Sequence, residues 1–346
     1  MLSYVSFYRA IEKKMAEDEE FRQKVAHRPL RSRARDFSDE ELLARLRSLG
    51  IELDRPALER LCDEALSAEE IIRPLNAKCV FNGTSEELEC DWIWICVDAL
   101  WRRWFPDNPS FEMLDDKIEE GYELKESGQV VAACRVWLEA WDDAMKIVDK
   151  GEFKTIDDFD DEFNGTHELC VLAEDLETGL WNAGREDGRF FVRRIEICEE
   201  ALKRFEMGND PALPNLRRAL AEHYIELGET GKADDLFHEW LDADPQCGWG
   251  WMLWSDCYRM TSAKFADLRR AEELLRKGLS IAGVTELQDL FERLVDLYEE
   301  QGRAAEAREV RRQAKSKKVR LNPANRNVYT DATVSGVRRK VRRNDP

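Results

Sequence analysis

The feature that most constrains the fold of this chain is a recurring residue spacing. Tyr224, Gly228, Ala233, Phe237 and Pro245 are separated by steps of 4, 5, 4 and 8 residues. The spacing predicts two helices joined by a tight turn, because each residue then has a mechanical role. The aromatic ring fills the space between the helices, and the glycine adopts the left-handed conformation that ends the first helix. The alanine lets the second helix approach closely, and the proline ends it.

The same spacing occurs elsewhere in the chain. The matching residues are Leu124, Gly128, Ala133, Trp137 and Ala140 upstream, and Tyr258, Tyr298, Gly302 and Ala307 downstream. Tyr258 follows Tyr224 by 34 residues, and this chain resembles the tetratricopeptide-repeat family, whose period is 34 residues. The resemblance implies helical hairpins stacked into a right-handed α-solenoid with a concave binding face.

We therefore expect an all-α protein with three parts: an N-terminal helical unit, a tetratricopeptide-like α-solenoid and a flexible basic tail. The expected bounds are 1–80, 86–320 and 321–346. In the first part we predict one helix over residues 1–26, then a basic link, a capped helix at Ser38 and two shorter helices. In the solenoid we predict about five hairpins, over residues 114–147, 167–205, 214–247, 248–283 and 288–317.

Two further segments of the solenoid carry their own expectations. Trp94, Val97, Trp101 and Trp104 share one face of a predicted helix, which favours packing against the first hairpin over an aromatic ligand cage. The acidic segment 151–165 is predicted to be a connector. Its residues 160–165 superficially match a calcium loop, but Val171 stands where the bidentate glutamate belongs, so a solvated loop is favoured.

Charge is distributed unevenly along the 346 residues. The net charge is −19, but residues 313–346 carry +8, which leaves −27 for the rest. The acidic body argues against a general nucleic-acid surface and leaves the tail as the candidate for such contacts. The longest apolar stretch, residues 92–100, is too short to span a bilayer, and the N-terminus does not match a signal peptide. We expect a cytoplasmic protein with no membrane partner.

The sequence offers little catalytic chemistry. It has four histidines, no H-E-x-x-H motif, no nucleophile elbow and no glycine-rich phosphate loop. None of the nine cysteines forms a C-x-x-C pair, which favours free thiols in a reducing compartment over a zinc site. We therefore expect that the protein is not an enzyme and that this chain binds no cofactor.

The candidate binding residues follow from the repeat resemblance, which implies that fixed positions of each hairpin's first helix line the concave groove. In this sequence the candidate partner-binding residues are Arg218, Glu222, Trp249, Met252, Asp256, Arg259 and Glu292. The lysine, arginine and asparagine clamp that captures carboxylates in some relatives is not present. Acidic residues instead favour a basic or amphipathic peptide, with Trp249 and Met252 as apolar anchors. A charged groove that is merely solvated is the alternative.

Trp249 and Trp251 lie two residues apart, so both cannot face the same side of a helix. Trp251 occupies the position that packs between helices, and Trp249 is therefore expected to face the groove.

The final ten residues, VRRKVRRNDP, resemble the lead-in of the SEC-C motif. In that family Arg-Asn-Asp-Pro immediately precedes Cys-Pro-Cys-Gly and the other residues that bind one zinc ion, and the motif contacts a chaperone and the ribosome. The resemblance implies a bacterial protein, with zinc expected only if such a motif follows Pro346.

The sequence thus favours an intracellular interaction scaffold that captures a partner segment in a concave groove. The alternative is a nucleic-acid- or ribosome-associated factor that binds through the basic tail and a zinc knuckle beyond it.

Overall fold

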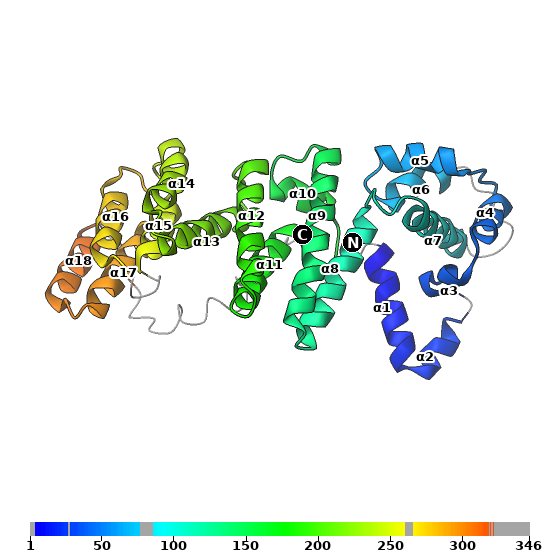
Figure 1. The fold of residues 1–346 in the computed structure, drawn as a ribbon, viewed down its shortest axis with the longest axis horizontal. Coiled ribbons are helices and arrows are strands. Elements are labelled where there is room, and N and C mark those ends of the chain that lie inside the picture. The colour runs from blue at the N-terminus through cyan, green and yellow to red at the C-terminus, as the bar shows by residue number, and fades with distance from the viewer. Residues whose placement is uncertain are drawn as a thin grey trace. The chain divides into compact units, whose positions relative to one another are not determined.

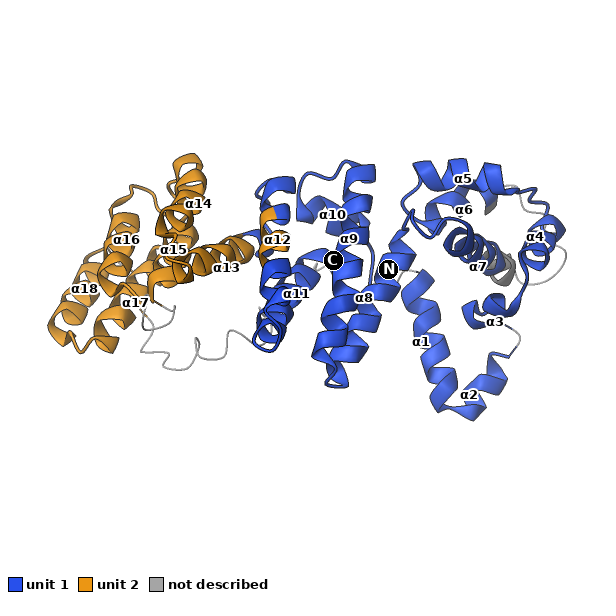
Figure 2. Cartoon of the chain, viewed as in Figure 1, with its two compact units in different colours: residues 1–194, 200–213 blue, residues 195–199, 214–346 orange. Residues whose placement is uncertain are grey.

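The computed structural model describes residues 4–26, 28–76, 86–259, 266–317, 319 and 321. These residues form eighteen α-helices and no strand, and the helices pack mainly as sequential pairs (Figure 1). The all-α prediction is confirmed. The chain divides into two compact units, one of residues 1–194 and 200–213 and the other of residues 195–199 and 214–346 (Figure 2). The predicted tail from residue 322 onward lies outside the described residues.

The first unit holds helices α1 to α11 and most of α12. Their bounds are α1 Tyr4–Glu17, α2 Glu19–Lys24, α3 Arg31–Asp36, α4 Asp39–Ser48, α5 Arg55–Glu64, α6 Ala68–Asn76, α7 Glu86–Trp104, α8 Phe111–Glu126, α9 Val130–Gly151, α10 Ile156–Glu162, α11 Leu169–Gly184 and α12 Arg189–Arg204.

The tryptophan-rich helix α7 is the centre of the N-terminal core. Trp94, Val97 and Trp101 are fully buried on one face, as the helical spacing predicts. Helix α7 packs mainly against α3, α4, α5 and α6. It also contacts the first predicted hairpin, as we expected, because the Trp94 indole donates to Glu112 of α8 at 3.3 Å and Met113 of α8 belongs to the same core. Tyr4 and Tyr8 of α1 stack on the Trp94 ring, with ring centroids 5.2 and 5.6 Å away. The aromatic residues therefore fill a core and form no open cage.

The predicted basic link contains a short helix, α3, and two further short helices that begin at a capping side chain interrupt segments that we predicted to be uniform. The predicted helix 1–26 breaks at Asp18, whose carboxylate accepts a hydrogen bond from Phe21 N (2.9 Å) and starts α2. The predicted acidic connector contains α10, which begins with a capping box between Thr155 and Asp158. Phe159 of α10 is fully buried. Both corrections have the same physical cause, since one side chain that caps a helix outweighs the average character of the segment.

The second unit contains the regular part of the molecule. Its helices are α13 Ala212–Glu226, which begins two residues inside the first unit, α14 Thr230–Ala243, α15 Gly248–Arg259, α16 Leu268–Ser280, α17 Leu287–Glu300 and α18 Ala304–Ser316. Each of the five predicted hairpin spans holds two consecutive helices, three of them in this unit and two in the first.

The turns at Gly128, Gly228 and Gly302 share one backbone geometry. Their φ angles are +81°, +80° and +69°. In each turn the residue after the glycine donates its N–H to the carbonyl four residues before the glycine, at 2.9, 2.8 and 2.8 Å. This is the Schellman arrangement, in which a left-handed residue allows the last carbonyls of a helix to be satisfied. The equivalence of Gly228 and Gly302, predicted from spacing, is confirmed.

The alanines that follow these turns are also equivalent. Ala133, Ala233 and Ala307 are each at most 1% exposed. Each lies five residues after its glycine, on the first turn of the second helix of the pair. A small residue at this position allows the second helix to lie close to the first.

Candidate functional site

The second unit packs the first helices of its last two hairpins, α15 and α17, side by side. Near their N-terminal ends, the backbone N–H of Trp249 donates to Glu286 Oε2 at 3.2 Å. At their C-terminal ends, Arg259 Nε donates to Glu300 Oε2 at 2.9 Å. The contacts occur in the same order along both helices, so α15 and α17 run parallel, as successive first helices of a repeat do.

Arg218 and Glu222 lie on the neighbouring first helix, α13, and form an ion pair with each other (2.5 Å). Cys257 of α15 donates its thiol hydrogen to the Arg218 carbonyl at 3.8 Å. Burial raises the pKa of Cys257, and the Glu222 carboxylate raises it further. These contacts bring candidate residues of α13 next to those of α15.

Trp249 is the most exposed of the candidate residues on α15. Its side chain is 37% exposed, whereas Trp251 is 3% exposed and donates its indole N–H to the Pro245 carbonyl at 3.0 Å. This division agrees with the expectation drawn from their two-residue spacing.

Met252 and Asp256 do not lie on an open surface, and here the expectation is corrected. Met252 is 0% exposed and belongs to the core of the second unit. Asp256 is 4% exposed and pairs with Arg293 of α17, which is 5% exposed. Arg293 thus fills the space beside Asp256 that we expected to be groove. Asp256 Oδ1, the other carboxylate oxygen, is buried and has no hydrogen-bond partner among the residues that the structure describes.

The exposed polar surface of this region belongs mainly to α17. Its carboxylates recur at helical spacing and form what we call the acidic face: Asp289, Glu292, Asp296, Glu299 and Glu300. Some are already engaged within the unit. Glu292 accepts a hydrogen bond from Gln288 (3.0 Å), and Glu299 accepts one from Arg311 (2.6 Å).

The acidic face carries an electrostatic cost. Partial burial raises the pKa of Asp289, and the carboxylates of Glu292 and Glu286 raise it further. Partial burial also raises the pKa of Asp296, with Arg259 opposing the shift and Glu300 adding to it. Like charges at these spacings repel one another on a helix. A cation bound here would lower both pKa values.

Neighbouring hairpins are joined by hydrogen bonds between tyrosines and carboxylates, which we did not predict from the sequence. Near the end of each first helix of the second unit, a tyrosine hydroxyl donates to a carboxylate on the preceding second helix. These three contacts, the tyrosine seams, are Tyr224 to Glu199 (2.7 Å), Tyr258 to Asp234 (2.8 Å) and Tyr298 to Glu272 (2.5 Å). The tyrosine spacing signalled the donors, but nothing in it identified the acceptors 25, 24 and 26 residues earlier.

Glu272 shows the electrostatics of a tyrosine seam. Arg303 Nη1 and Arg276 Nε donate to it at 2.6 and 2.9 Å, beside Tyr298. Partial burial acts to raise the pKa of Glu272, but the hydrogen bonds from Tyr298 and the two arginines outweigh it and lower the pKa to about 2.

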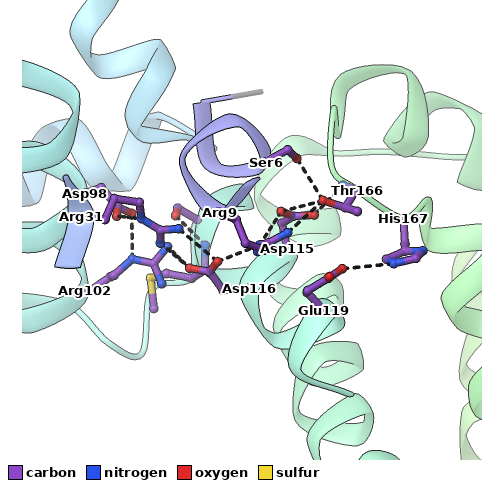
Figure 3. Close-up of polar contacts among 12 residues, drawn as sticks. Ser6, Arg9, Arg31, Asp98, Arg102, Asp115, Asp116, Glu119, Thr166 and His167 are labelled. Carbon is purple, nitrogen blue, oxygen red and sulfur yellow. Dashed lines mark hydrogen bonds and ion pairs between the residues drawn. The ribbon is translucent and has the colours of Figure 1, made fainter. Parts of the chain in front are cut away.

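The first unit contains a buried ion-pair network (Figure 3). Arg31 of α3 pairs with Asp116 of α8 and lies 3.5 Å from Asp98 of α7. Arg102 bridges the same two carboxylates at 2.8 Å to Asp98 and 2.9 Å to Asp116. Burial acts to raise the pKa of Asp116, but the guanidinium groups of Arg31 and Arg102 hold it well below its usual range.

Arg9 extends this network from α1. Its Nη2 lies 2.7 Å from both Asp115 and Asp116. Asp115 is fully buried and also accepts the backbone N–H of Thr166 at 2.6 Å. Figure 3 shows Arg9 between the two aspartates, with His167 and Glu119 forming a separate contact of 3.2 Å. We identified no part of this network from the sequence, because its residues lie up to 157 positions apart and follow no period.

The acidic segment that superficially matched a calcium loop has a structural role. Asp160 accepts the backbone N–H groups of Leu169 (2.5 Å) and Cys170 (3.1 Å) at the start of α11. Burial raises its pKa to about 6, although both hydrogen bonds oppose the shift. Across the described ranges, no three His, Cys, Asp or Glu side chains converge as a metal ion would require.

Seven cysteines carry free thiols: Cys62, Cys96, Cys134, Cys170, Cys198, Cys247 and Cys257. Five are buried: Cys62, Cys96, Cys134, Cys198 and Cys257. In the part of the chain that the structure describes, no helix combines the length and apolar character needed to cross a membrane.

No protein-family model matches this sequence, and no curated protein matches it significantly.

Proposed function

We propose that this protein is an interaction scaffold, without catalytic activity of its own, whose second unit is a tetratricopeptide-like solenoid that captures a basic or amphipathic segment of a partner protein. The recurring contacts support the repeat interpretation. The same glycine turn closes α13–α14 and α17–α18, and the tyrosine seams join each hairpin to the one before it. Stacked hairpins of this kind present their first helices on a concave side.

The observation that carries the partner proposal is the acidic face of α17. Partial burial is the main reason that the pKa values of Asp289 and Asp296 are raised, and neighbouring carboxylates, Glu292 beside Asp289 and Glu300 beside Asp296, add to the shift. Lysine or arginine side chains of a partner would relieve this repulsion, and complementary charge also speeds association. Trp249 adds an exposed aromatic side chain at the start of the adjacent α15, and aromatic anchors dominate many interfaces.

Met252 and Asp256 change their proposed roles. Met252 supports the core beneath the surface, and the Asp256–Arg293 pair holds α15 against α17. The proposed partner-contacting residues are therefore Trp249, Glu292 and the other carboxylates of the acidic face, with Arg218, Glu222 and Arg259 at its margin.

The test compares wild type with Trp249→Ala in a pull-down from native cytosol, followed by calorimetry with the captured partner. We expect Trp249→Ala to weaken partner binding by about 1–3 kcal/mol. Leu227→Ala is the matched control, since Leu227 is an apolar residue of the second unit that is 60% exposed and lies outside α15 and α17. Equal affinity for wild type and Trp249→Ala would contradict the proposal.

The second candidate is a nucleic-acid- or ribosome-associated factor, which the +8 charge of residues 313–346 favours. In the SEC-C resemblance this tail leads to a zinc knuckle. Salt dependence separates the two functions, because release of counterions from phosphates makes nucleic-acid affinity fall steeply with salt. Steep salt dependence that disappears when the tail is removed would favour this candidate over the acidic face.

A further inference from the structure

A cavity in the first unit has an acidic wall, and its residues are different from those of the proposed partner surface in the second unit. Its volume is about 360 Å³, and α1, α6, α8 and the segment from α10 to residue 165 enclose it. The carboxylates that line it are Glu69, Glu70, Glu112, Asp115, Asp161 and Glu162. Arg73 is the one basic side chain in this lining.

Glu112 is the most informative residue of this wall because it is 5% exposed. Its Oε2 accepts the backbone N–H of Ala68 (3.1 Å), and its Oε1 accepts those of Glu69 (3.2 Å) and the Trp94 indole (3.3 Å). All three donors are neutral. Among the described residues, no lysine, arginine or histidine forms an ion pair with Glu112.

A buried carboxylate normally has a cation beside it, because burial of an uncompensated charge costs several kcal/mol. Asp115, one turn further along α8, obtains such a partner in Arg9. Glu112 does not, and burial accordingly raises its pKa, with the Asp98 carboxylate adding to the shift. The cavity is thus bordered by a buried carboxylate that the N-terminus of α6 and the Trp94 indole hydrogen-bond, and with which no cationic side chain of the described residues pairs.

The distribution of the carboxylates indicates the kind of cation. A metal ion needs several ligands around one point, and within the described residues no such convergence exists. The acids are instead spread along the wall. Tyr4, Phe111 and Phe163 supply aromatic rings to the same lining, and aromatic rings attract ammonium and guanidinium groups.

We propose that this cavity binds an organic cation that carries two or more ammonium or guanidinium groups. One group pairs with Glu112 at the inner wall, and a second pairs with Asp161 and Glu162, which are exposed on the α10 side. A free polyamine and the adjacent basic side chains of a peptide share this chemistry.

The experiment titrates the full chain with spermidine, with N-acetyl-Arg-Arg-amide and with a neutral diol of matched length, by calorimetry. In parallel, ¹⁵N-labelled protein reports on the Trp94 indole N–H, assigned with Trp94→Phe, because that group bonds to Glu112. We expect both cations, but not the diol, to bind and to shift the Trp94 signal. The tighter of the two identifies the source as polyamine or peptide.

Variants locate the binding. Glu112→Gln is expected to weaken binding roughly tenfold or more, because a partner of a buried charge pair is lost. Since this change also alters the start of α6, the exposed pair Asp161→Asn and Glu162→Gln provides a second test, with an expected loss of roughly threefold to tenfold. The control is Glu126→Gln, an exposed carboxylate at the end of α8 outside the cavity.

Three results would overturn the proposal. They are the absence of binding by either cation at millimolar concentration, binding that all variants leave unchanged, and a Trp94 shift produced by Ca²⁺ at lower concentration than by the organic cations. Loss of partner capture in Trp249→Ala is independent of all three, so failure here and failure of the proposed function are distinguishable.

Discussion

The N-terminal helices and the hairpins of the second unit are held together in different ways. In the second unit, the same tyrosine-to-carboxylate contact appears at each junction, about 25 residues apart in sequence. Around α7, a few large aromatic side chains and a buried arginine–aspartate network join residues that lie up to 107 positions apart. A contact that recurs leaves a period in the sequence, and a contact made once leaves none.

The two kinds of contact should differ in how much free energy of unfolding is lost when one of them is removed. The tyrosine seams are surface or half-buried contacts repeated at equivalent junctions, whereas the arginine–aspartate contacts around α7 place charges in a buried setting where each charge needs its partner. Loss of one member of the α7 network should therefore cost more than any single change in a repeated turn.

The largest effect is expected for Arg31→Ala. This removes the more deeply buried of the two arginines that bridge Asp98 and Asp116 and leaves Arg102 alone between these carboxylates. We expect a loss of about 3–5 kcal/mol in the free energy of unfolding, which is typical of breaking a buried pair. Urea unfolding and hydrogen exchange of the α7 amides would measure it. The control is Arg35→Ala, which changes an exposed arginine on the same short helix. An equal loss of unfolding free energy in both variants would show that the buried network does not stabilise the protein more than an exposed arginine does.

Overpacking of a repeated helix contact should cost less. Ala233 is 1% exposed, and Ala233→Leu is expected to lower the free energy of unfolding by about 1–3 kcal/mol because the helix pair cannot close around the larger side chain. The matched control is Ala243→Leu, the same substitution at an exposed position on α14. An unchanged melting temperature for Ala233→Leu would mean that α13 and α14 do not close at this residue.

The turns provide the sharpest comparison within the repeats. Gly228→Ala and Gly302→Ala should each cost about 1–2 kcal/mol, because φ is near +80° and +69° while a Cβ would meet no atom within 4 Å. The cost is thus backbone strain alone. Gly231→Ala also meets no atom within 4 Å, and no positive φ occurs there, so it should be neutral or slightly stabilising. Thermal unfolding that fails to separate Gly231 from the other two would remove the argument for equivalent turns.

The smallest effect concerns the pH dependence of one tyrosine seam. The pKa of Glu272 is lowered from 4.5 to about 2 in the folded state, so the folded state binds this proton less readily than the unfolded chain. Its stabilising contribution is present above pH 4.5 and is lost as pH falls towards 2. Glu272→Gln should therefore reduce stability more at pH 6 than at pH 3, as measured by urea unfolding. A pH-independent effect of Glu272→Gln would argue against the shift.

The sequence predicted much of the second unit because local rules decide it. The positions of Gly228, Gly302 and their alanines determine where helices end and how closely they pack, and these follow from chain stiffness and side-chain size. The break at Asp18 and helix α10 were missed because a single capping side chain decides each of them. For α10 the signal was available, since Thr155 and Asp158 have capping-box spacing.

The candidate site was predictable only in part. Helical spacing correctly separated exposed Trp249 from buried Trp251. It could not show that Arg293 turns inward to meet Asp256, because that pairing depends on how α15 and α17 pack. The cavity beside Glu112 could not be predicted from residue spacing, because segments that lie between residue 4 and residue 165 line it.

The tyrosine seams also bear on how a chain like this changes length during evolution. The hairpin α13–α14 carries a donor for the hairpin before it, Tyr224, and an acceptor for the hairpin after it, Asp234. The hairpin α15–α16 carries the same pair of functions in Tyr258 and Glu272. Each of these two hairpins therefore supplies a tyrosine donor to the hairpin before it and a carboxylate acceptor to the hairpin after it. Duplication or deletion of one whole hairpin would leave every hydroxyl facing a carboxylate, whereas a partial insertion would leave a mismatched junction.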